Sequence, residues 1–334
     1  MDIVATLGTE KTTIHLTSVQ VVQDLLPRNA VLVTDENVAT AWPAFADTRK
    51  TIVVPPGEGS KRIPTYERVL ESLAEAGADR STPVVAWGGG VVGDLAGFAA
   101  GTYMRGVSLI QVPTSLLAMV DSSVGGKVGI DLAAGKNLAG AFVAPKDVYV
   151  ATEFLATLPE REFRAGMAEV IKYGFIMDAR LLDTLGGDLE PLVARCIGLK
   201  VRVVDEDPYE TLGRRAILNF GHTVGHAIEH ATGYGPVLHG EAVAIGMVVE
   251  SRLAHILGLA REELSSEVER VLAQHGLPTR IPEGLTPEQL LAAMRRDKKA
   301  KAGRLGFSLV SEPGKCTLVP NVPEEAVLRA LSNS

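Results

Sequence analysis

A glycine-rich segment directly after a short apolar run constrains the fold more than any other feature. Pro83–Trp87 is followed by Gly88, Gly90 and Gly93 in the spacing G-x-G-x-x-G, and then by the helix-like Leu95–Ala100. In this strand, turn and helix context, glycines let the backbone approach a pyrophosphate, and the helix offers unpaired N–H groups. A turn that only permits tight packing has the same pattern, so both interpretations stay open.

Short apolar runs before and after this segment alternate with helical spacing. Ala30–Thr34, Thr51–Val54 and Val107–Val112 have the composition of buried strands, and Tyr66–Ala76 has a helical apolar stripe. This alternation is typical of βαβ units. It predicts an α/β N-terminal domain with a parallel, Rossmann-like sheet over residues 1–151.

The pattern changes from about Thr152 onward. Apolar residues then recur at helical spacing, as in Ala165–Met177 and Glu241–Leu257, and little strand signal returns before Phe307–Val310. We therefore expect a mainly α-helical C-terminal domain over residues 152–334. A length of 334 residues also suits two domains better than one.

Composition excludes several classes of protein. The net charge of -7 argues against nonspecific nucleic-acid binding, which relies on clustered Lys and Arg. The longest uncharged stretch, Gly106–Val120, contains Pro113 and is shorter than the roughly 20 apolar residues of a membrane helix. The N-terminus has no basic segment followed by an apolar one, so we expect no export and a cytoplasmic location. Two cysteines are too few for a disulfide framework.

The glycine motif lacks one part of a dinucleotide site. No acidic residue lies between Asp94 and Asp121, so the ribose-binding carboxylate expected about 20 residues after the glycines is missing. A bound dinucleotide would need its ribose held from another strand end. Asp35, or the segment near Glu58 and Lys61, is the natural place.

Four of the seven histidines are clustered. His222, His226 and His230 stand at i, i+4 and i+8, along one face of a predicted helix, and His239 begins the next helical stripe. Two histidines and a carboxylate with an open position are typical of a catalytic zinc. For His230, at the predicted helix end, an ordinary surface role is the favoured interpretation.

The carboxylate ligand should come from another helix. Glu169 is the best candidate because Glu169 and Lys172 interrupt an apolar face where a purely structural helix would carry neither.

Isolated basic residues among small residues form a further group. Arg105, Lys127 and Lys136 each stand beside glycine, and Lys172, Lys200 and Arg215 follow. Single basic residues of this kind are usually solvated. Several in succession, with glycine clearing space, indicate groups that bind an anion.

These motifs resemble the 3-dehydroquinate synthase family. The matching stretches are Gly88–Asp94, Pro113–Lys127, Gly166–Lys172, Leu218–His226 and His239–Val243, with weaker matches at Asp35–Asn37, Glu58–Lys61 and Asp297–Lys299. The resemblance implies an NAD- and zinc-dependent lyase of the shikimate pathway of aromatic amino-acid biosynthesis. Such an enzyme converts 3-deoxy-D-arabino-heptulosonate 7-phosphate (DAHP) to 3-dehydroquinate and phosphate by transient oxidation, phosphate elimination, re-reduction and an intramolecular aldol step. Another divalent ion, such as Co²⁺, can replace zinc.

The resemblance also implies a set of site residues. Zinc is held by Glu169, His222 and His239, and the catalytic residues are His226, Glu210 and Lys127, of which His226 transfers a proton and Glu210 acts as a base. Substrate contacts are Arg105, Asp121, Lys127, Asn137, Lys172, Lys200, Arg215, Asn219, Lys298 and Lys299. NAD contacts are Asp35, Asn37, Glu58, Lys61, Gly89, Gly90, Val91, Asp94, Thr114, Ser115, Lys136, Asn137, Phe154 and Thr157.

The chain departs from the family pattern in two places. The segment from Glu210 to Arg215 is one residue longer than usual, and Ser115 stands where a threonine is common. Alternatives are another sugar phosphate cyclase of the deoxyinosose or valiolone type, a metal-dependent polyol or glycerol-phosphate dehydrogenase, and a non-catalytic NAD-binding regulator. The retained Asn219, His226 and Lys200 favour the dehydroquinate synthase, which the resemblance also implies to be a homodimer acting on a small molecule.

Overall fold

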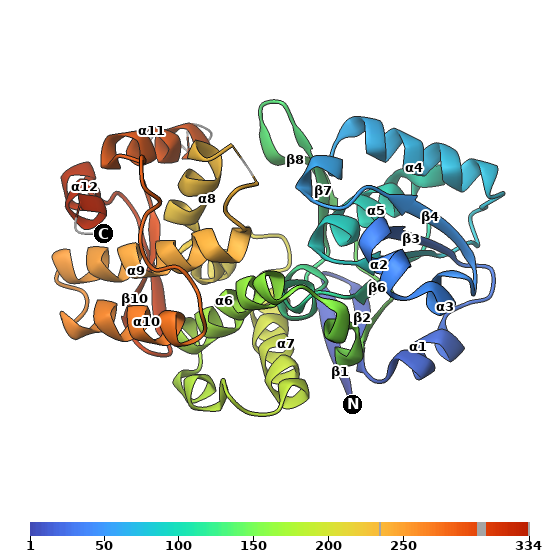
Figure 1. Ribbon diagram of the computed structural model, residues 1–334, viewed down its shortest axis with the longest axis horizontal. Coiled ribbons are helices and arrows are strands. Elements are labelled where there is room, and N and C mark those ends of the chain that lie inside the picture. The colour runs from blue at the N-terminus through green and yellow to red at the C-terminus, as the bar shows by residue number, and fades with distance from the viewer. Residues whose placement is uncertain (234, 299–304, 333–334) are drawn as a thin grey trace. The chain divides into compact units, whose positions relative to one another are not determined.

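A computed structural model describes residues 1–233, 235–298 and 305–332. The chain packs as two compact units (Figure 1). Unit 1 comprises Met1–Pro159 and Leu189–Thr211, and unit 2 comprises Glu160–Asp188 and Leu212–Ser334. No helix of the described residues is both long enough and apolar enough to cross a membrane.

Unit 1 is built around a seven-stranded sheet in the order β1-β2-β9-β6-β5-β3-β4. All neighbouring strands are parallel except β1 and β2, so the predicted parallel sheet is confirmed. A separate antiparallel hairpin, β7–β8, was not predicted. The strands are β1 (Asp2–Leu7), β2 (Glu10–Leu16), β3 (Val31–Asp35), β4 (Lys50–Val54), β5 (Val84–Gly88), β6 (Leu109–Pro113), β7 (Lys127–Leu132), β8 (Gly135–Phe142) and β9 (Asp147–Val150).

Helices cover the sheet because its strands are apolar on both faces. Every residue of β5 is buried, as expected for a central parallel strand. Side chains of β3, β5, α4 and α5 form one apolar core, and α7 packs against β1. The α-helices of unit 1 are α1 (Val19–Leu25), α2 (Glu36–Ala41), α3 (Pro43–Ala46), α4 (Ile63–Glu75), α5 (Gly90–Thr102) and α7 (Leu189–Glu206).

Unit 2 is mainly helical, as predicted. Its helix α9 packs against α8, α10, α12 and the strand β10 (Figure 1). Their apolar side chains, with those of α11, form the core of this unit. The elements are α6 (Glu160–Ile176), α8 (His222–Ala231), α9 (His239–Ile256), α10 (Glu263–Gln274), α11 (Pro287–Lys298), α12 (Glu324–Ser332) and the hairpin β10 (Phe307–Glu312) with β11 (Lys315–Val319).

Glycine permits the close packing of α9 that brings its first residue near α6. A Cβ atom on Gly240 would lie 1.9 Å from the carbonyl oxygen of Ala165, so a larger residue would force the two helices apart. Gly221, at φ +82, lets the chain turn directly into α8. These two positions place His239 and His222 at the starts of adjacent helices.

Candidate active site

The glycine motif joins β5 to α5 in unit 1. Gly88 ends β5, and α5 begins at Gly90, earlier than the predicted Leu95–Ala100 segment. Gly89 is the N-cap residue and supplies no side-chain hydrogen bond, while Val91 lies in the first turn. The start of α5 therefore has N–H groups that an anion can accept from.

The strand next to β5 continues beside this turn. The Thr114 N–H donates to the carbonyl oxygen of Gly88 at 2.9 Å. A Cβ atom on Gly89 would lie 3.4 Å from the Ser115 hydroxyl oxygen. Two of the predicted NAD contacts thus flank the glycine turn.

Lys61 connects several predicted NAD residues. Its Nζ donates to Asp94 Oδ2 and to Asn137 Oδ1, each at 2.5 Å. Glu58 Oε1 lies 4.0 Å from Lys61 Nζ and 3.3 Å from Lys136 Nζ. Burial raises the pKa of the Asp94 carboxyl, although Lys61 acts in the opposite direction. Five residues predicted from separate segments therefore form one polar group.

The remaining predicted NAD residues lie in two places. Asp35 caps α2, and its Oδ1 accepts from the backbone N–H groups of Asn37 at 2.9 Å and Val38 at 3.0 Å. Thr157 Oγ1 accepts from Trp42 Nε1 at 2.9 Å. Phe154 is buried, with its ring edge-to-face against Trp42. The side chain of Phe154 thus belongs to the core, so a contact to NAD would come from its backbone.

Two of the predicted substrate-binding lysines of unit 1 form ion pairs. Lys127 Nζ donates to Glu210 Oε1, and Glu210 has a left-handed φ of 57. Lys200 is buried and its Nζ donates to Asp121, including the Asp121 carbonyl oxygen at 2.5 Å. Arg105 follows α5 at φ 70. The structure thus brings Lys127 to Glu210 and Lys200 to Asp121, as neutralised pairs.

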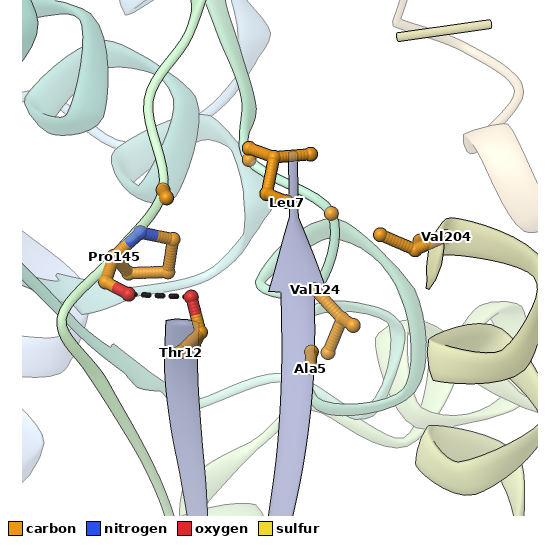
Figure 2. A pocket seen from close by; sticks show the side chains of 9 residues that line it. Ala5, Leu7, Thr12, Val124, Pro145 and Val204 are labelled. Carbon is orange, nitrogen blue, oxygen red and sulfur yellow. Dashed lines mark hydrogen bonds between the residues drawn. The ribbon is translucent and has the colours of Figure 1, made fainter. Parts of the chain in front are cut away.

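The hollow in Figure 2 is a separate feature of unit 1. Ala5, Leu7 and Val204 line it, and Thr12 Oγ1 donates to the carbonyl oxygen of Pro145 at its wall (Figure 2). Its volume of about 10 Å³ is about the space that one water molecule needs. It is too small for a dinucleotide or a sugar phosphate.

In unit 2 the three predicted metal ligands come together. One ligand atom from each of Glu169, His222 and His239 lies within 4.8 Å of the other two. Glu169 Oε1 is 3.7 Å from His222 Nε2. The residues come from α6, α8 and α9, so the fold assembles the triad from three separate helices.

Glu169 shows how well this triad suits a cation. The side chain is fully buried, and its Oε2 accepts from Lys172 Nζ. Its Oε1 is buried without a hydrogen-bond partner among the described residues. Such an oxygen is costly to bury unless it has a ligand. A metal ion beside the two histidines would satisfy it.

His222 is in the state that a metal ligand needs. Burial, together with the charge of Lys172, holds its pKa well below the usual range, so the ring is neutral. Its Nδ1 donates to the carbonyl oxygen of Phe220 at 3.2 Å. This hydrogen bond fixes the tautomer and leaves the lone pair of Nε2 facing Glu169.

His226 and His230 have different surroundings. The ring centroids of His226 and His239 are 6.0 Å apart, and His226 is exposed one turn after His222. His230 is exposed in the last turn of α8 and belongs to neither potential metal group of the described residues.

The other predicted residues of unit 2 precede α8 or lie near the described boundary. Arg215 is buried and Asn219 exposed in the short helix Arg214–Asn219. Lys298 ends α11, and its side chain lies outside the described part of the structure, as does the whole of Lys299.

Two buried glutamates were missed by the sequence analysis. Glu229 Oε2 lies 3.3 Å from His239 Nδ1. Glu250 Oε2 accepts from the Gly221 N–H at 2.7 Å, and its Oε1 from the Val224 N–H at 3.2 Å. Glu229 stands seven residues after His222, on the same helical face, and that spacing was the available signal.

Comparison with known proteins identifies the family. Residues 51–165 match the family described as 3-dehydroquinate synthase N-terminal, and residues 166–300 match 3-dehydroquinate synthase C-terminal. The 3-dehydroquinate synthase of Xanthomonas axonopodis pv. citri (strain 306) is 47% identical, over 91% of this chain and 89% of that protein. The chain belongs to the 3-dehydroquinate synthase family, and it is an enzyme.

Two solved structures share the fold over nearly the whole chain. A 2-deoxy-scyllo-inosose synthase, complexed with carbaglucose-6-phosphate, NAD⁺ and Co²⁺, has a TM-score of 0.87 at 28% identity and covers 100% of both chains. The 2-epi-5-epi-valiolone synthase from Streptomyces hygroscopicus subsp. jinggangensis 5008, with NAD⁺ and Zn²⁺ bound, has a TM-score of 0.89 at 27% identity and covers 99% of this chain and 98% of that one. These relatives are sugar phosphate cyclases.

Proposed function

We propose that this enzyme converts DAHP to 3-dehydroquinate and inorganic phosphate, with NAD used catalytically and a divalent metal ion. The buried, unsatisfied Glu169 Oε1 beside two histidines carries this proposal, because that arrangement fits a metal ion. The NAD⁺ and the Zn²⁺ or Co²⁺ bound by the two cyclases support the same cofactors here. Zinc, or another divalent ion, would bind Glu169, His222 and His239.

The cofactors and the side chains of the enzyme would have different roles in the reaction. When bound, NAD would accept and return a hydride, and the metal ion would polarise the carbon–oxygen group that is oxidised. Transient oxidation acidifies the neighbouring C–H, which explains a redox cofactor in a reaction without net redox change. The side chains of the enzyme supply binding, orientation and proton transfer.

Basic side chains would bind the phosphate and carboxylate of the substrate. Lys127 and Lys200 are held by carboxylates in unit 1, so each is already oriented before an anion binds. Lys172 would neutralise part of the charge of Glu169. Fixed cations stabilise a leaving phosphate without reorganisation, and they orient the substrate for elimination. The further proposed substrate contacts are Arg105, Asp121, Asn137, Arg215, Asn219, Lys298 and Lys299.

His226 is the proposed proton-transfer group. It is exposed on α8 while the neighbouring His222 is neutral and directed at Glu169, so the two histidines have separate roles. Glu210 is the second proposed acid or base, and it forms an ion pair with Lys127. Proton transfer by a positioned side chain is worth roughly 10²–10⁴-fold in rate.

The polar group around Lys61 is the proposed NAD site, with the start of α5 receiving the pyrophosphate. It comprises Glu58, Lys61, Asp94, Lys136 and Asn137, and it supplies the carboxylates that the sequence after the glycines lacks. The remaining proposed contacts are Asp35, Asn37, Gly89, Gly90, Val91, Thr114, Ser115, Phe154 and Thr157. We assign NAD to residues 1–151 and metal and substrate to residues 152–334, with Arg105, Asp121, Lys127 and Asn137 as further substrate contacts from the first range. A homodimer and a cytoplasmic location are parts of the same proposal.

The test is an assay with DAHP, zinc and NAD at a concentration far below that of DAHP. We expect phosphate release to continue well beyond the amount of NAD, with 3-dehydroquinate as product and no accumulation of NADH. Stoichiometric NADH would indicate a dehydrogenase, and absence of phosphate would overturn the proposal. A different carbocycle from another sugar phosphate would favour the deoxyinosose or valiolone type.

A further inference from the structure

We propose that Glu229 is a positioning residue of the metal site, which holds the ring of His239 in the orientation and tautomer that bind the ion. The inference rests on the metal site of the proposed function. It adds a residue that does not contact the ion and acts through a ligand.

The geometry of Glu229 carries the inference. Its side chain is only 4% exposed, and its Oε2 lies 3.3 Å from His239 Nδ1. A carboxylate can only accept, so Nδ1 of His239 bears the hydrogen. The Nε2 atom of His239 is then the nitrogen with a lone pair, as a metal ligand requires.

His239 and His222 are therefore oriented in the same way by different acceptors. His222 Nδ1 donates to the backbone carbonyl oxygen of Phe220, whereas His239 Nδ1 donates to a charged side chain. Metal-binding histidines commonly donate their second N–H to a carboxylate or a carbonyl, which fixes the ring and makes the ligand more basic. Both forms occur in this one triad.

His239 needs its acceptor more than His222 does. The side chain of His239 is 33% exposed, whereas that of His222 is 13% exposed. His239 is also the first residue of α9, so only one side of it is fixed by helical structure. A buried carboxylate on α8 can hold this ring where packing does not.

A second interpretation is that Glu229 binds the ion directly. Single ligand atoms of His226, Glu229 and His239 also lie within 4.8 Å of one another. The orienting role is favoured because Glu169 Oε1 has no hydrogen-bond partner among the described residues, whereas Glu229 already contacts a ring nitrogen of His239. An ion bound among His226, Glu229 and His239 would leave Glu169 unsatisfied.

The experiment is a titration of the metal-free full chain with Co²⁺, followed by visible absorption, which reports on the ligands of the ion. The variants are Glu229→Ala, Glu229→Gln and the control Glu263→Gln, which removes one exposed carboxylate from the same unit. We expect Glu229→Ala to weaken Co²⁺ binding about 10–100-fold, with the spectral type retained. Glu229→Gln should weaken it less, because its amide oxygen still accepts from Nδ1, and Glu263→Gln should bind as the wild type does.

A double-mutant cycle separates an orienting role from general damage to the fold. In a His239→Ala background, Glu229→Ala should cause no further loss of Co²⁺ affinity, because the ring it orients is gone. A further loss in that background would overturn the inference. Unaltered binding in Glu229→Ala would also overturn it, as would loss of the Co²⁺ spectrum in Glu229→Gln, which would make Glu229 a ligand.

Different results would contradict the proposed function and the proposed role of Glu229. If wild-type protein binds no Co²⁺, or if His222→Ala binds it unchanged, the metal site itself is wrong. If those two results are as expected and only the Glu229 variants behave like wild type, the positioning role alone is lost. Glu229→Gln keeps the size of the side chain, so it stays informative if Glu229→Ala does not fold.

Discussion

The charged side chains of the two proposed sites differ in whether they already have partners of opposite charge. In unit 1, basic side chains are paired with carboxylates, as in Lys61 with Asp94 and Lys200 with Asp121. In unit 2, Glu169 has one oxygen paired with Lys172 and one that has no hydrogen-bond partner within the described part of the chain, beside a neutral His222. The basic side chains of the site in unit 1 are neutralised by carboxylates before a ligand binds. Unit 2 instead contains a set of metal-ligand atoms that a cation would bind.

The two sites therefore obtain their selectivity in different ways. An anionic ligand of unit 1 must share or rearrange existing ion pairs, so its affinity depends on the exchange of partners. A cation in unit 2 meets buried ligands that are already assembled and neutralised in part. We therefore expect substitutions in unit 2 to have the larger effects on activity, and substitutions in unit 1 to act more on NAD and substrate binding.

The largest expected effect comes from the metal ligands. His222→Ala should lose both bound metal and activity, because one of three ligands is removed. His226→Ala should retain the metal but lose roughly 10²–10⁴-fold in turnover, as expected for a proton-transfer group. Metal content by mass spectrometry and phosphate release measure the two effects. Loss of metal in His226→Ala would show that ligand and base had been exchanged.

Substitution of Lys61 tests the ion pairs of the proposed NAD site in unit 1. Lys61→Met should destabilise the fold by about 3 kcal/mol, because it leaves the carboxyl of Asp94 without its cation. NAD affinity should fall, while Co²⁺ affinity in unit 2 stays unchanged. Denaturant unfolding and NAD titration are the measurements. Adding Asp94→Asn should recover part of the stability, and an additive loss would contradict the pairing.

A smaller effect is expected where α9 meets α6. Gly240→Ala should destabilise the protein by about 1–3 kcal/mol, because its Cβ would lie 1.9 Å from the Ala165 carbonyl oxygen. It should also weaken metal binding, since the two helices carry Glu169 and His239. Gly198→Ala is the control, because no atom of the described residues lies within 4 Å of its Cβ position. Equal thermal unfolding of the two variants would contradict this packing.

The smallest effect concerns the thiol of Cys316 in unit 2. Burial raises the pKa of Cys316 to about 12 from 9.0. Its contribution to stability is therefore fully present below pH 9.0 and is lost as the pH rises toward about 12, because the unfolded thiol ionises first. Thiol alkylation at pH 8 should be slow in the native protein and fast after unfolding. Cys316 is half-buried, and rapid alkylation of the native thiol would contradict the raised pKa.

Much of the fold was predictable because periodicity reports burial directly. The runs Thr51–Val54 and Pro83–Trp87 fall on β4 and β5, and the apolar stripe Ala165–Met177 falls on α6. The hairpins β1–β2 and β7–β8 were missed because their strands are largely exposed or mixed in burial and give no apolar run. Leu189–Glu206 was expected among the C-terminal helices, yet it packs with unit 1. The spacing of apolar residues along a helix does not show which unit the helix packs against.

The sites divide in a similar way. Chemistry-bearing motifs identified Glu169, His222 and His239, which the fold brings together. Glu229 was missed although its spacing from His222 was a signal, and Glu250 was missed because its contacts lie on the neighbouring helix and at the turn before it. The ion pair between Lys127 and Glu210 joins distant segments, so spacing could not predict it.

The proposed metal site is best tested in a crystal of zinc-loaded protein, with the ion located by anomalous scattering at the zinc edge. We expect one peak, within bonding distance of Glu169 Oε1 and of the Nε2 atoms of His222 and His239, with the Glu229 carboxylate accepting from His239 Nδ1. A peak among His226, Glu229 and His239, with Glu169 still unsatisfied, would contradict it.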